Sequence, residues 1–228
     1  LTDNMPKALV SVAGKTMLER VILKLKDAGF HDITINIHHF GSQIIDFLRA
    51  NQNFGVDIHI SDERGELLDT GGGIKKARPL LESNEPFLIH NADILTDLDL
   101  NAFYHLESDA DATLLTNHRK TSRYLLMDQN NRLCGWTNIS TGEVLPKELD
   151  YPSDHYQLQA FGCVHVLSPS IFRYMEDERW TGKFSIIPFY VDICPKARIQ
   201  GFPIDSENWF DVGKPETLAK AEAYYASL

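Results

Sequence analysis

Apolar residues in the first half of the chain recur with two different spacings. Five of them fall on one face of a helix: Met17, Leu18, Val21, Ile22 and Leu25. This pattern predicts a helix over 15–29 that ends at Gly29, because glycine commonly follows a helix end. Helical spacing also predicts helices over 42–55, 74–81 and 215–228. Alternation or short apolar runs predict strands at 33–37, 56–61 and 86–93. Strands separated by helices indicate βαβ units, so we predict an α/β fold with a mostly parallel sheet.

The second half has less regular patterning. Apolar runs predict strands within 112–118, 124–128, 132–136, 157–168 and 197–204, and an extended segment at 208–213. Gln129 to Asn131 suit a hairpin turn, and Ser168-Pro169 suits the start of a helix that runs through Tyr174. The segment of about 129–157 is expected to be largely an irregular flap. No linker divides the chain, so we predict one domain over 1–228.

Charge and composition exclude several classes of protein. The formal net charge of -10 leaves no basic surplus for nucleic acid phosphates, so no nucleic acid partner is expected. Three cysteines without a C-x-x-C pair indicate neither a zinc site nor a disulfide framework. No apolar run approaches the ~20 residues that span a bilayer, and no signal peptide is visible. We therefore expect a cytoplasmic protein without a membrane partner.

Three consecutive glycines, Gly71, Gly72 and Gly73, stand where the helix of 74–81 begins. A glycine-led helix start offers unpaired backbone N–H groups to an anion with no side chain in the way. The same residues also suit an ordinary tight turn. The run by itself leaves both interpretations open, a nucleotide-binding edge and a turn.

Two aspartates occupy places where an open α/β sheet binds ligands, beyond the carboxyl ends of its strands. Asp93 follows a buried strand, and Asp211 lies in an apolar setting before the last helix. Each alone is typical of a helix cap or a turn. If the two converge at ~4 Å, they repel by about 4 kcal/mol at an effective dielectric constant of ~20 and need a cation. Oxygen ligands without a Cys or His cluster predict magnesium or manganese. Lys7 is either a surface lysine or a phosphate contact at the same edge.

Five segments together resemble the sugar-1-phosphate nucleotidyltransferase family. In chain order they are LTDNMPKALVSVAGKTMLE, GELLDTGGGIKKARPLL, FLIHNADIL, FGCVHVLSP and WFDVGKPETLAKA. They spread over nearly the whole chain and are specific as a set. The E-x-L-x-T-G-G-G form most resembles bacterial N-acetylmuramate-1-phosphate uridylyltransferases, with mannose-1-phosphate guanylyltransferases close behind.

The resemblance implies a Rossmann-like three-layer sandwich with a small antiparallel flap for the acceptor sugar. It also implies a reaction in which a sugar 1-phosphate attacks the α-phosphorus of a nucleoside triphosphate and pyrophosphate leaves. By the same resemblance, Asp93 and Asp211 hold Mg²⁺, and Lys7 offsets charge on the reacting phosphates. We expect a monomer or a small homo-oligomer.

The remaining site residues also follow from the resemblance. Thr70 and the three glycines are expected beside the nucleoside, and Glu66 or nearby backbone at the base. Asn91 is expected by the ribose or the sugar, and Gly162 on the acceptor side. The base stays open: a carboxylate such as Glu66 favours guanine, while the triple glycine resembles the uridylyltransferases.

The sequence departs from the family pattern at its beginning. The family carries a strand and a G-x-G-T-R loop directly upstream of P-L-T-D-x-x-P-K, whereas this sequence starts at LTD. We expect that this first strand and phosphate loop precede the sequence given. Without them we expect little or no catalysis.

Two other classes of protein compete with this interpretation. A glycosyltransferase of similar fold would use a D-x-D metal motif, which Asp97 to Asp99 match on paper. We disfavour it because Asp99 is placed as the cap of the next helix. A catalytically silent nucleotide-sugar-binding module is the other alternative.

Overall fold

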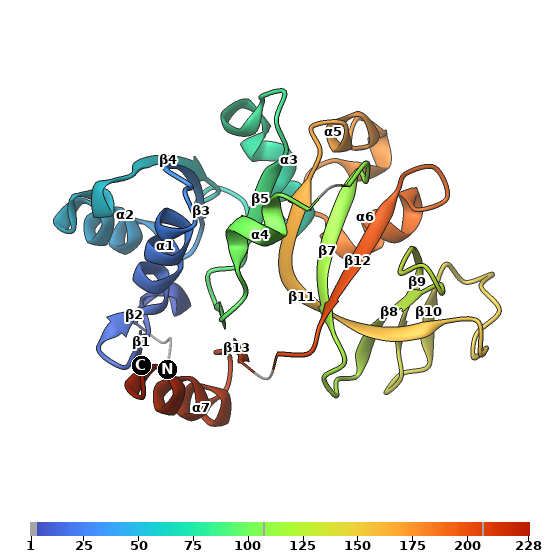
Figure 1. Ribbon diagram of the computed structural model, residues 1–228. Helices are drawn as coiled ribbons and strands as arrows, with labels where there is room; N and C mark the ends of the chain where they lie inside the picture. Colours follow the sequence, from blue (N-terminus) through green and yellow to red (C-terminus); the bar gives the residue numbers. More distant parts are fainter. Residues whose placement is uncertain (1–3, 107, 207) are drawn as a thin grey trace. The chain divides into compact units, whose positions relative to one another are not determined.

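The computed structural model describes residues 4–106, 108–206 and 208–228 (Figure 1). Contacts between these residues fall into two compact units. The first comprises the described residues of Leu1–Leu67, His90–Leu106 and Ser206–Leu228. The second comprises those of Leu68–Ile89 and Glu107–Asp205. Nothing in this division tests the prediction of one domain, which stays a prediction.

The first unit combines helices with three two-stranded sheets. Its helical elements are η1 (Lys7–Leu9), α1 (Met17–Asp27), α2 (Gly41–Ala50), η2 (Gln52–Gly55), α4 (Leu100–Tyr104) and α7 (Pro215–Ala226). Strands β1 (Ser11–Val12) and β2 (Lys15–Thr16) pair antiparallel, and so do β6 (Ile94–Thr96) and β13 (Trp209–Asp211). Strands β3 (Asp32–Ile37) and β4 (Asp57–Asp62) pair parallel. The predicted strands at 33–37 and 56–61 are therefore confirmed to within a residue.

Helix α1 forms where the sequence pattern predicts it. The Thr16 side chain caps its start by accepting a hydrogen bond from the backbone N–H of Glu19 at 3.1 Å. The five apolar residues that define the predicted face are all buried. Gly29 follows the end of the helix with a φ of 94°, a conformation that glycine adopts without strain.

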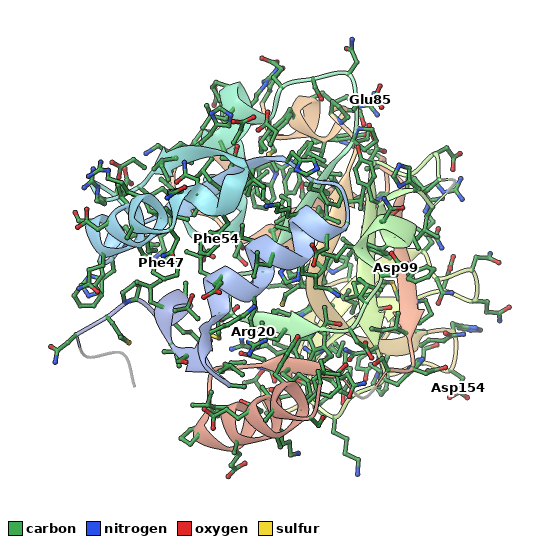
Figure 2. All side chains as sticks on the ribbon, turned by 60° about the vertical axis from the view of Figure 1, so that its left-hand side comes forward. Arg20, Phe47, Phe54, Glu85, Asp99 and Asp154 are labelled. Carbon is green, nitrogen blue, oxygen red and sulfur yellow. The ribbon has the colours of Figure 1, made fainter. Side chains whose placement is uncertain are left out.

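The helix predicted over 42–55 ends early, at Ala50. Gln52, Asn53 and Phe54 have φ values of 51°, 51° and 56°, so the right-handed helix cannot continue through them. Lys26 Nζ donates a hydrogen bond to the Phe54 carbonyl at 2.7 Å. The Phe54 ring lies 5.8 Å from that of Phe47, measured between centroids; both residues are labelled in Figure 2. These contacts hold the left-handed turn against its cost of roughly 1–2 kcal/mol per residue.

The second unit is built on a seven-stranded sheet. Its strands are β5 (Phe87–His90), β7 (Ala112–Asn117), β8 (Arg123–Met127), β9 (Leu133–Asn138), β10 (Glu143–Leu145), β11 (Gln157–Leu167) and β12 (Ile199–Ile204). The order is β10-β9-β8-β11-β7-β12, and β5 pairs with β11 (Figure 1). Helices α3 (Asp69–Leu81), α5 (Ile171–Tyr174) and α6 (Ile186–Ile193) share one hydrophobic core with β7, β8, β9, β11 and β12. A short helical turn, η3, spans Glu178–Trp180.

The sheet is mixed where the sequence predicts mostly parallel strands. Strands β7 and β12 pair parallel, but β10-β9, β9-β8, β8-β11 and β11-β7 pair antiparallel. The predicted turn at Gln129–Asn131 is confirmed, because it joins β8 and β9 as a hairpin. The segment of 129–157 is more ordered than predicted, since β9 and β10 form a second hairpin within it. The α/β class itself is confirmed.

Two helices of the second unit differ from the sequence prediction. Helix α3 begins at Asp69 and includes all three glycines, whereas the pattern predicts a start at 74. Helix α6 was not predicted, because nearly every position of its run is apolar, so no polar face marks a helical period, and because Pro188 stands near its start. None of the helices in the described part of the chain has the length and apolar character needed to span a bilayer.

Candidate functional site

Three charged side chains of the first unit converge on one point. Lys7 Nζ lies 2.5 Å from Asp93 Oδ2 and 3.5 Å from Asp211 Oδ1. The two carboxylate oxygens are therefore at most about 6 Å apart, the sum of those two distances. Residues from the N-terminal segment, the middle and the end of the chain are brought together here, as expected for these three positions.

A backbone ladder positions the two aspartates. Strands β6 and β13 pair antiparallel, with Asp211 opposite Ile94. Beyond that pair, the Val212 N–H donates to the Asp93 carbonyl at 3.0 Å. Backbone pairing thus holds the two residues close together, because Asp211 belongs to β13 and Asp93 directly precedes β6, the strand paired with it.

The cluster is partly exposed, and its charges act on one another. Side-chain exposure is 37% for Lys7, 31% for Asp93 and 54% for Asp211. Burial alone would lower the pKa of Lys7, but the hydrogen bond and charge of Asp93, together with the charge of Asp211, raise it. Lys7 is therefore a cation at neutral pH.

Gly213 makes room for this arrangement. A Cβ atom at this position would lie 3.0 Å from Asp211 Oδ1 and 3.1 Å from Lys7 Nζ. Any side chain here would push against both charged groups. The sequence analysis did not single out Gly213, although a glycine two residues after Asp211 is the signal that points to it.

The donor set suits a hard divalent cation that also takes ligands from a substrate. Among the described residues, no group of three or more His, Cys, Asp or Glu side chains could hold a metal ion. Mg²⁺ is commonly bound through one or two carboxylates, with the remaining positions filled by water and substrate phosphates. The Asp93–Asp211 pair fits that pattern, whereas a Zn²⁺ site would need more nitrogen or sulfur ligands.

The turn between β5 and β6 fixes the position of Asp93. Burial lowers the pKa of His90 to about 4, so its ring is neutral at neutral pH. His90 Nδ1 lies 2.8 Å from the Asn91 carbonyl oxygen, which can only accept, so Nδ1 carries the proton. The same carbonyl accepts from the Ile94 N–H at 3.2 Å. Asn91 thus shapes this turn through its backbone, and contact of its side chain with a ligand stays a prediction.

Glu66 is exposed, and its backbone N–H donates to the Glu63 carbonyl at 3.0 Å. The sequence analysis did not single out Glu63 as a candidate polar residue of the site. Its side chain is buried, since Glu63 is 1% exposed, and it accepts a hydrogen bond from Asn36 Nδ2 at 2.7 Å. Glu63 follows the end of β4 directly, and a polar residue at such a place is the signal that could have found it.

The glycines of α3 have a packing role in the second unit. The N–H groups of Gly71 and Gly72 donate to the Phe184 carbonyl at 2.9 and 3.1 Å. A Cβ on Gly71 would lie 2.3 Å from the Phe184 ring, and one on Gly72 would lie 2.3 Å from the Gly182 carbonyl oxygen. Thr70 Oγ1 accepts from the Ile186 N–H at 3.0 Å. Close approach of another backbone segment therefore explains the glycines at 71 and 72, and a nucleotide contact at Thr70, Gly71, Gly72 or Gly73 stays a prediction.

Gly162 occupies an irregularity in β11. The pairing of β11 with β7 shifts between Phe161 and His165, and Cys163 within that interval has a φ of 58°. A Cβ on Gly162 would lie 2.8 Å from the Leu115 side chain on β7. Bulges of this kind bend a strand and are frequent next to active sites. Contact of Gly162 with a sugar stays a prediction.

The D-x-D segment has structural roles. Asp99 Oδ1 accepts from the Ala102 N–H at 2.9 Å and so caps α4; the residue is labelled in Figure 2. Asp97 accepts hydrogen bonds from Ser206 Oγ and Asn208 Nδ2, both at 2.8 Å. The prediction that Asp99 is a helix cap is confirmed.

The chain is similar to proteins of one family. The family model described as nucleotidyl transferase matches residues 1–227. N-acetylmuramate alpha-1-phosphate uridylyltransferase of Caulobacter vibrioides is 29% identical over 231 residues, which cover 99% of this chain and 90% of that protein. The enzyme of the same name in Neisseria meningitidis is 44% identical over 108 residues, or 47% of this chain and 46% of its own. A mannose-1-phosphate guanyltransferase of Gibberella zeae is 33% identical over 233 residues, covering all of this chain and 60% of its own. The chain thus spans less than two thirds of the last two proteins.

Solved structures share the fold. HddC from Yersinia pseudotuberculosis, crystallised in complex with GMP-PN, gives a TM-score of 0.75 at 23% identity, covering 99% of this chain and 92% of its own. A putative glucose-1-phosphate thymidylyltransferase from Bacillus anthracis gives a TM-score of 0.78 at 16% identity, and the match covers 100% of this chain and 89% of its own. These likenesses confirm the Rossmann-like α/β fold that the sequence resemblance implies.

Proposed function

The chain belongs to the nucleotidyl transferase family, among the sugar-1-phosphate nucleotidyltransferases, and we propose that it moves a nucleoside monophosphate from a nucleoside triphosphate to a sugar 1-phosphate. A phosphate oxygen of the sugar 1-phosphate forms the new bond to the α-phosphorus of the triphosphate. The bond from that phosphorus to the β-phosphate bridging oxygen breaks, and pyrophosphate leaves with the electron pair. The products are a nucleoside diphosphate sugar and pyrophosphate.

The observation that carries this proposal is the convergence of Lys7, Asp93 and Asp211. Asp93 and Asp211 are the residues that would hold Mg²⁺, or Mn²⁺, and the ion would polarise phosphate oxygens of the substrates. Lys7 would offset negative charge on the phosphates through its ammonium group. Phosphoryl transfer depends on positioning and charge stabilisation, so this cluster needs no nucleophilic side chain.

For the substrates, we propose uridylyl transfer to an amino-sugar 1-phosphate such as N-acetylmuramate 1-phosphate. Support comes from the E-x-L-x-T-G-G-G segment and from two N-acetylmuramate alpha-1-phosphate uridylyltransferases among the relatives. Under this proposal the nucleoside lies along the start of α3, the ribose or sugar near Asn91, and the acceptor near Gly162. The reaction would take place in the cytoplasm.

Guanylyl transfer to mannose 1-phosphate is the second candidate. The carboxylate of Glu66 is exposed, and a carboxylate can accept two hydrogen bonds from the edge of guanine, whereas uracil offers one N–H. The 33% identity to a mannose-1-phosphate guanyltransferase over the whole chain adds to this support. A silent nucleotide-sugar-binding module remains the alternative if binding occurs without turnover.

A pyrophosphate-release screen on the full-length protein tests the proposal. Four nucleoside triphosphates are each combined with a panel of sugar 1-phosphates in the presence of Mg²⁺. We expect release with UTP and N-acetylmuramate 1-phosphate. Release with GTP and mannose 1-phosphate would select the second candidate. If no pair releases pyrophosphate while calorimetry shows tight binding of a nucleotide sugar, the chain is a binding module.

A further inference from the structure

Lys7 competes for the carboxylate oxygen that a metal ion would use. Its Nζ lies 2.5 Å from Asp93 Oδ2, a charge-assisted hydrogen bond, and only 3.5 Å from Asp211 Oδ1. A magnesium ion binds carboxylate oxygen at about 2.1 Å. An ion on the same Oδ2 would therefore stand within about 5 Å of the ammonium group, and the two cations would repel each other. A metal ion bound to Oδ2 of Asp93 therefore requires Lys7 to move away.

The two aspartates stay in place if Lys7 leaves. Their segments are joined by the β6–β13 ladder and by the bond from Val212 N–H to the Asp93 carbonyl. Lys7 comes from a different element, η1, and reaches the pair through a flexible four-carbon side chain. The lysine is therefore the movable member of the cluster, and the carboxylates are the fixed ones.

We propose that Lys7 is the internal counter-ion of the Asp93–Asp211 pair and gives up Asp93 to a divalent cation when a triphosphate offers its ammonium group another anionic partner. This inference rests on the proposed function. It makes the free protein a weak binder of divalent cations, and it makes binding of the cation and of the triphosphate mutually supportive. Lys7 thus delays metal binding until the nucleotide arrives.

The test measures the affinity of the protein for Mn²⁺ in the absence of nucleotide. The concentration of free Mn²⁺ is followed by electron paramagnetic resonance. Lys7→Met removes the competing cation, and Lys220→Met removes the same charge from an exposed position on α7. We expect Lys7→Met to bind Mn²⁺ about tenfold more tightly than the wild type, the factor for one lost charge-assisted hydrogen bond. Lys220→Met should bind Mn²⁺ as the wild type does.

A second measurement, the melting temperature with and without Mn²⁺, allows for a Lys7→Met variant that is less stable than the wild type. Without Lys7 the two carboxylates repel each other, so the melting temperature of Lys7→Met should be lower than that of the wild type without metal. Added Mn²⁺ should then raise it by more than it raises the wild-type value, because tighter binding to the folded state stabilises more. Lys7→Gln, which keeps a hydrogen-bond donor without the charge, should behave in the same way.

The outcomes separate this inference from the proposed function. If Lys7→Met binds Mn²⁺ no more tightly than the wild type, and Mn²⁺ raises both melting temperatures equally, Lys7 is not a competing counter-ion. Turnover by the wild type would leave the proposed function standing in that case. If the wild type turns over no substrate pair and Asp211→Asn binds Mn²⁺ as the wild type does, the proposed function itself fails.

Discussion

The Nδ1 atom of His165 lies 2.6 Å from the hydroxyl oxygen of Tyr190, within the core of the second unit. His165 is 2% exposed and Tyr190 is completely buried. Burial lowers the pKa of the imidazole to about 3 and raises the pKa of the Tyr190 phenol well above its usual value. Both groups are therefore neutral at physiological pH, and the pair is a core hydrogen bond that makes the stability of the protein depend on pH.

We expect the free energy of unfolding to fall as the pH drops from about 6.5 towards 3. In that window the unfolded chain protonates His165 at its ordinary pKa of about 6.5, whereas the folded protein does not. The unfolded state thus binds more protons than the folded state. Each pKa unit of difference between the two states lowers the free energy of unfolding by up to about 1.4 kcal/mol. His90, with its pKa lowered to about 4, adds to the loss. Urea unfolding at a series of pH values measures the effect.

Two histidine variants test this prediction when the pH dependence of their stability is compared with that of the wild type. His165→Gln should reduce the dependence between pH 6.5 and 3 and leave the part that comes from His90, even though the variant is less stable throughout. His105→Gln changes an exposed histidine and should keep the wild-type slope. Equal slopes for all three proteins would show that His165 does not titrate differently in the two states.

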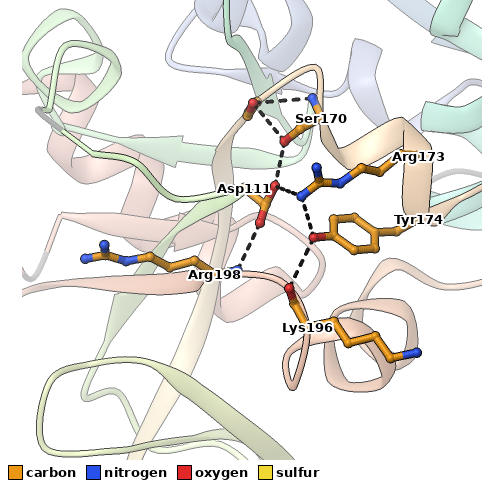
Figure 3. Close-up of polar contacts among 7 residues, drawn as sticks. Asp111, Ser170, Arg173, Tyr174, Lys196 and Arg198 are labelled. Atoms are coloured by element: carbon orange, nitrogen blue, oxygen red, sulfur yellow. Dashed lines mark hydrogen bonds and ion pairs between the residues drawn. The ribbon is translucent and has the colours of Figure 1, made fainter.

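The side chain of Asp111 joins the segments that contain Ser170, Arg173 and Arg198 (Figure 3). Its Oδ1 accepts from Ser170 Oγ at 2.5 Å and from Arg173 Nη2 at 3.4 Å, and its Oδ2 accepts from the Arg198 N–H at 3.0 Å. We expect Asp111→Ala to lower the free energy of unfolding by about 1–3 kcal/mol, because it removes the hydrogen bonds that a largely buried carboxylate accepts. Chemical denaturation would measure the loss.

Asp109→Ala is the matched control for this change. The Asp109 carboxylate contacts the Arg198 guanidinium but is 78% exposed, against 13% for that of Asp111. Exposed ion pairs contribute about 0–1 kcal/mol, so the control should be nearly neutral. A loss in Asp109→Ala as large as that in Asp111→Ala would contradict the role given to the Asp111 network.

Gly72→Ala should destabilise the protein by about 1–3 kcal/mol or more, the usual cost of overpacking. The new methyl group would lie 2.3 Å from the Gly182 carbonyl oxygen and 3.0 Å from Leu68 Cβ, and backbone cannot move aside cheaply. Gly65→Ala is the control, because nothing lies within 4 Å of its added Cβ. Thermal unfolding of both variants would decide the matter, and equal melting temperatures would refute the close packing at Gly72.

Asp211→Asn should lower turnover by orders of magnitude with little change in melting temperature. The substitution keeps the shape of the side chain but removes the charge that a divalent cation needs. Pyrophosphate release from the full-length protein, with the substrate pair found in the screen, is the measurement.

Asp99→Asn is the matched control for Asp211→Asn. Asparagine caps a helix as well as aspartate does, so α4 and its stability should be retained. Turnover should be retained as well, since Asp99 caps α4. Loss of activity in Asp99→Asn with wild-type turnover in Asp211→Asn would move the metal site to the D-x-D segment.

Local signals in the sequence predict the elements but only part of their arrangement. The helical face of α1 and the glycine after it give that element almost to the residue, because capping and amphipathic spacing are local properties. The turn after α2 was missed, because the hydrogen bond from Lys26 and the contact of Phe54 with Phe47 come from tertiary structure. The antiparallel pairings of β11 were missed for the same reason, since strand direction is not a local property.

The candidate site shows the same division. Spacing places Asp93 and Asp211 at the ends of strands, but only the resemblance to a family suggests that they meet. Their convergence depends on β6 pairing with β13, segments that are far apart in the sequence. For Gly71 and Gly72, sequence reasoning offered a nucleotide-binding edge or a tight turn, and in the structure the segment around Phe184 lies against both glycines.

The β6–β13 ladder also has a consequence for synthesis of the protein. Asp211 lies in β13, so a ribosome must add more than one hundred residues after β6 before that strand can reach it. Closing so long a loop is slow compared with forming the local helices. A nascent chain therefore carries Lys7 and Asp93 before Asp211 is made, and the carboxylate pair can form only after the strand that contains Asp211 has left the ribosome.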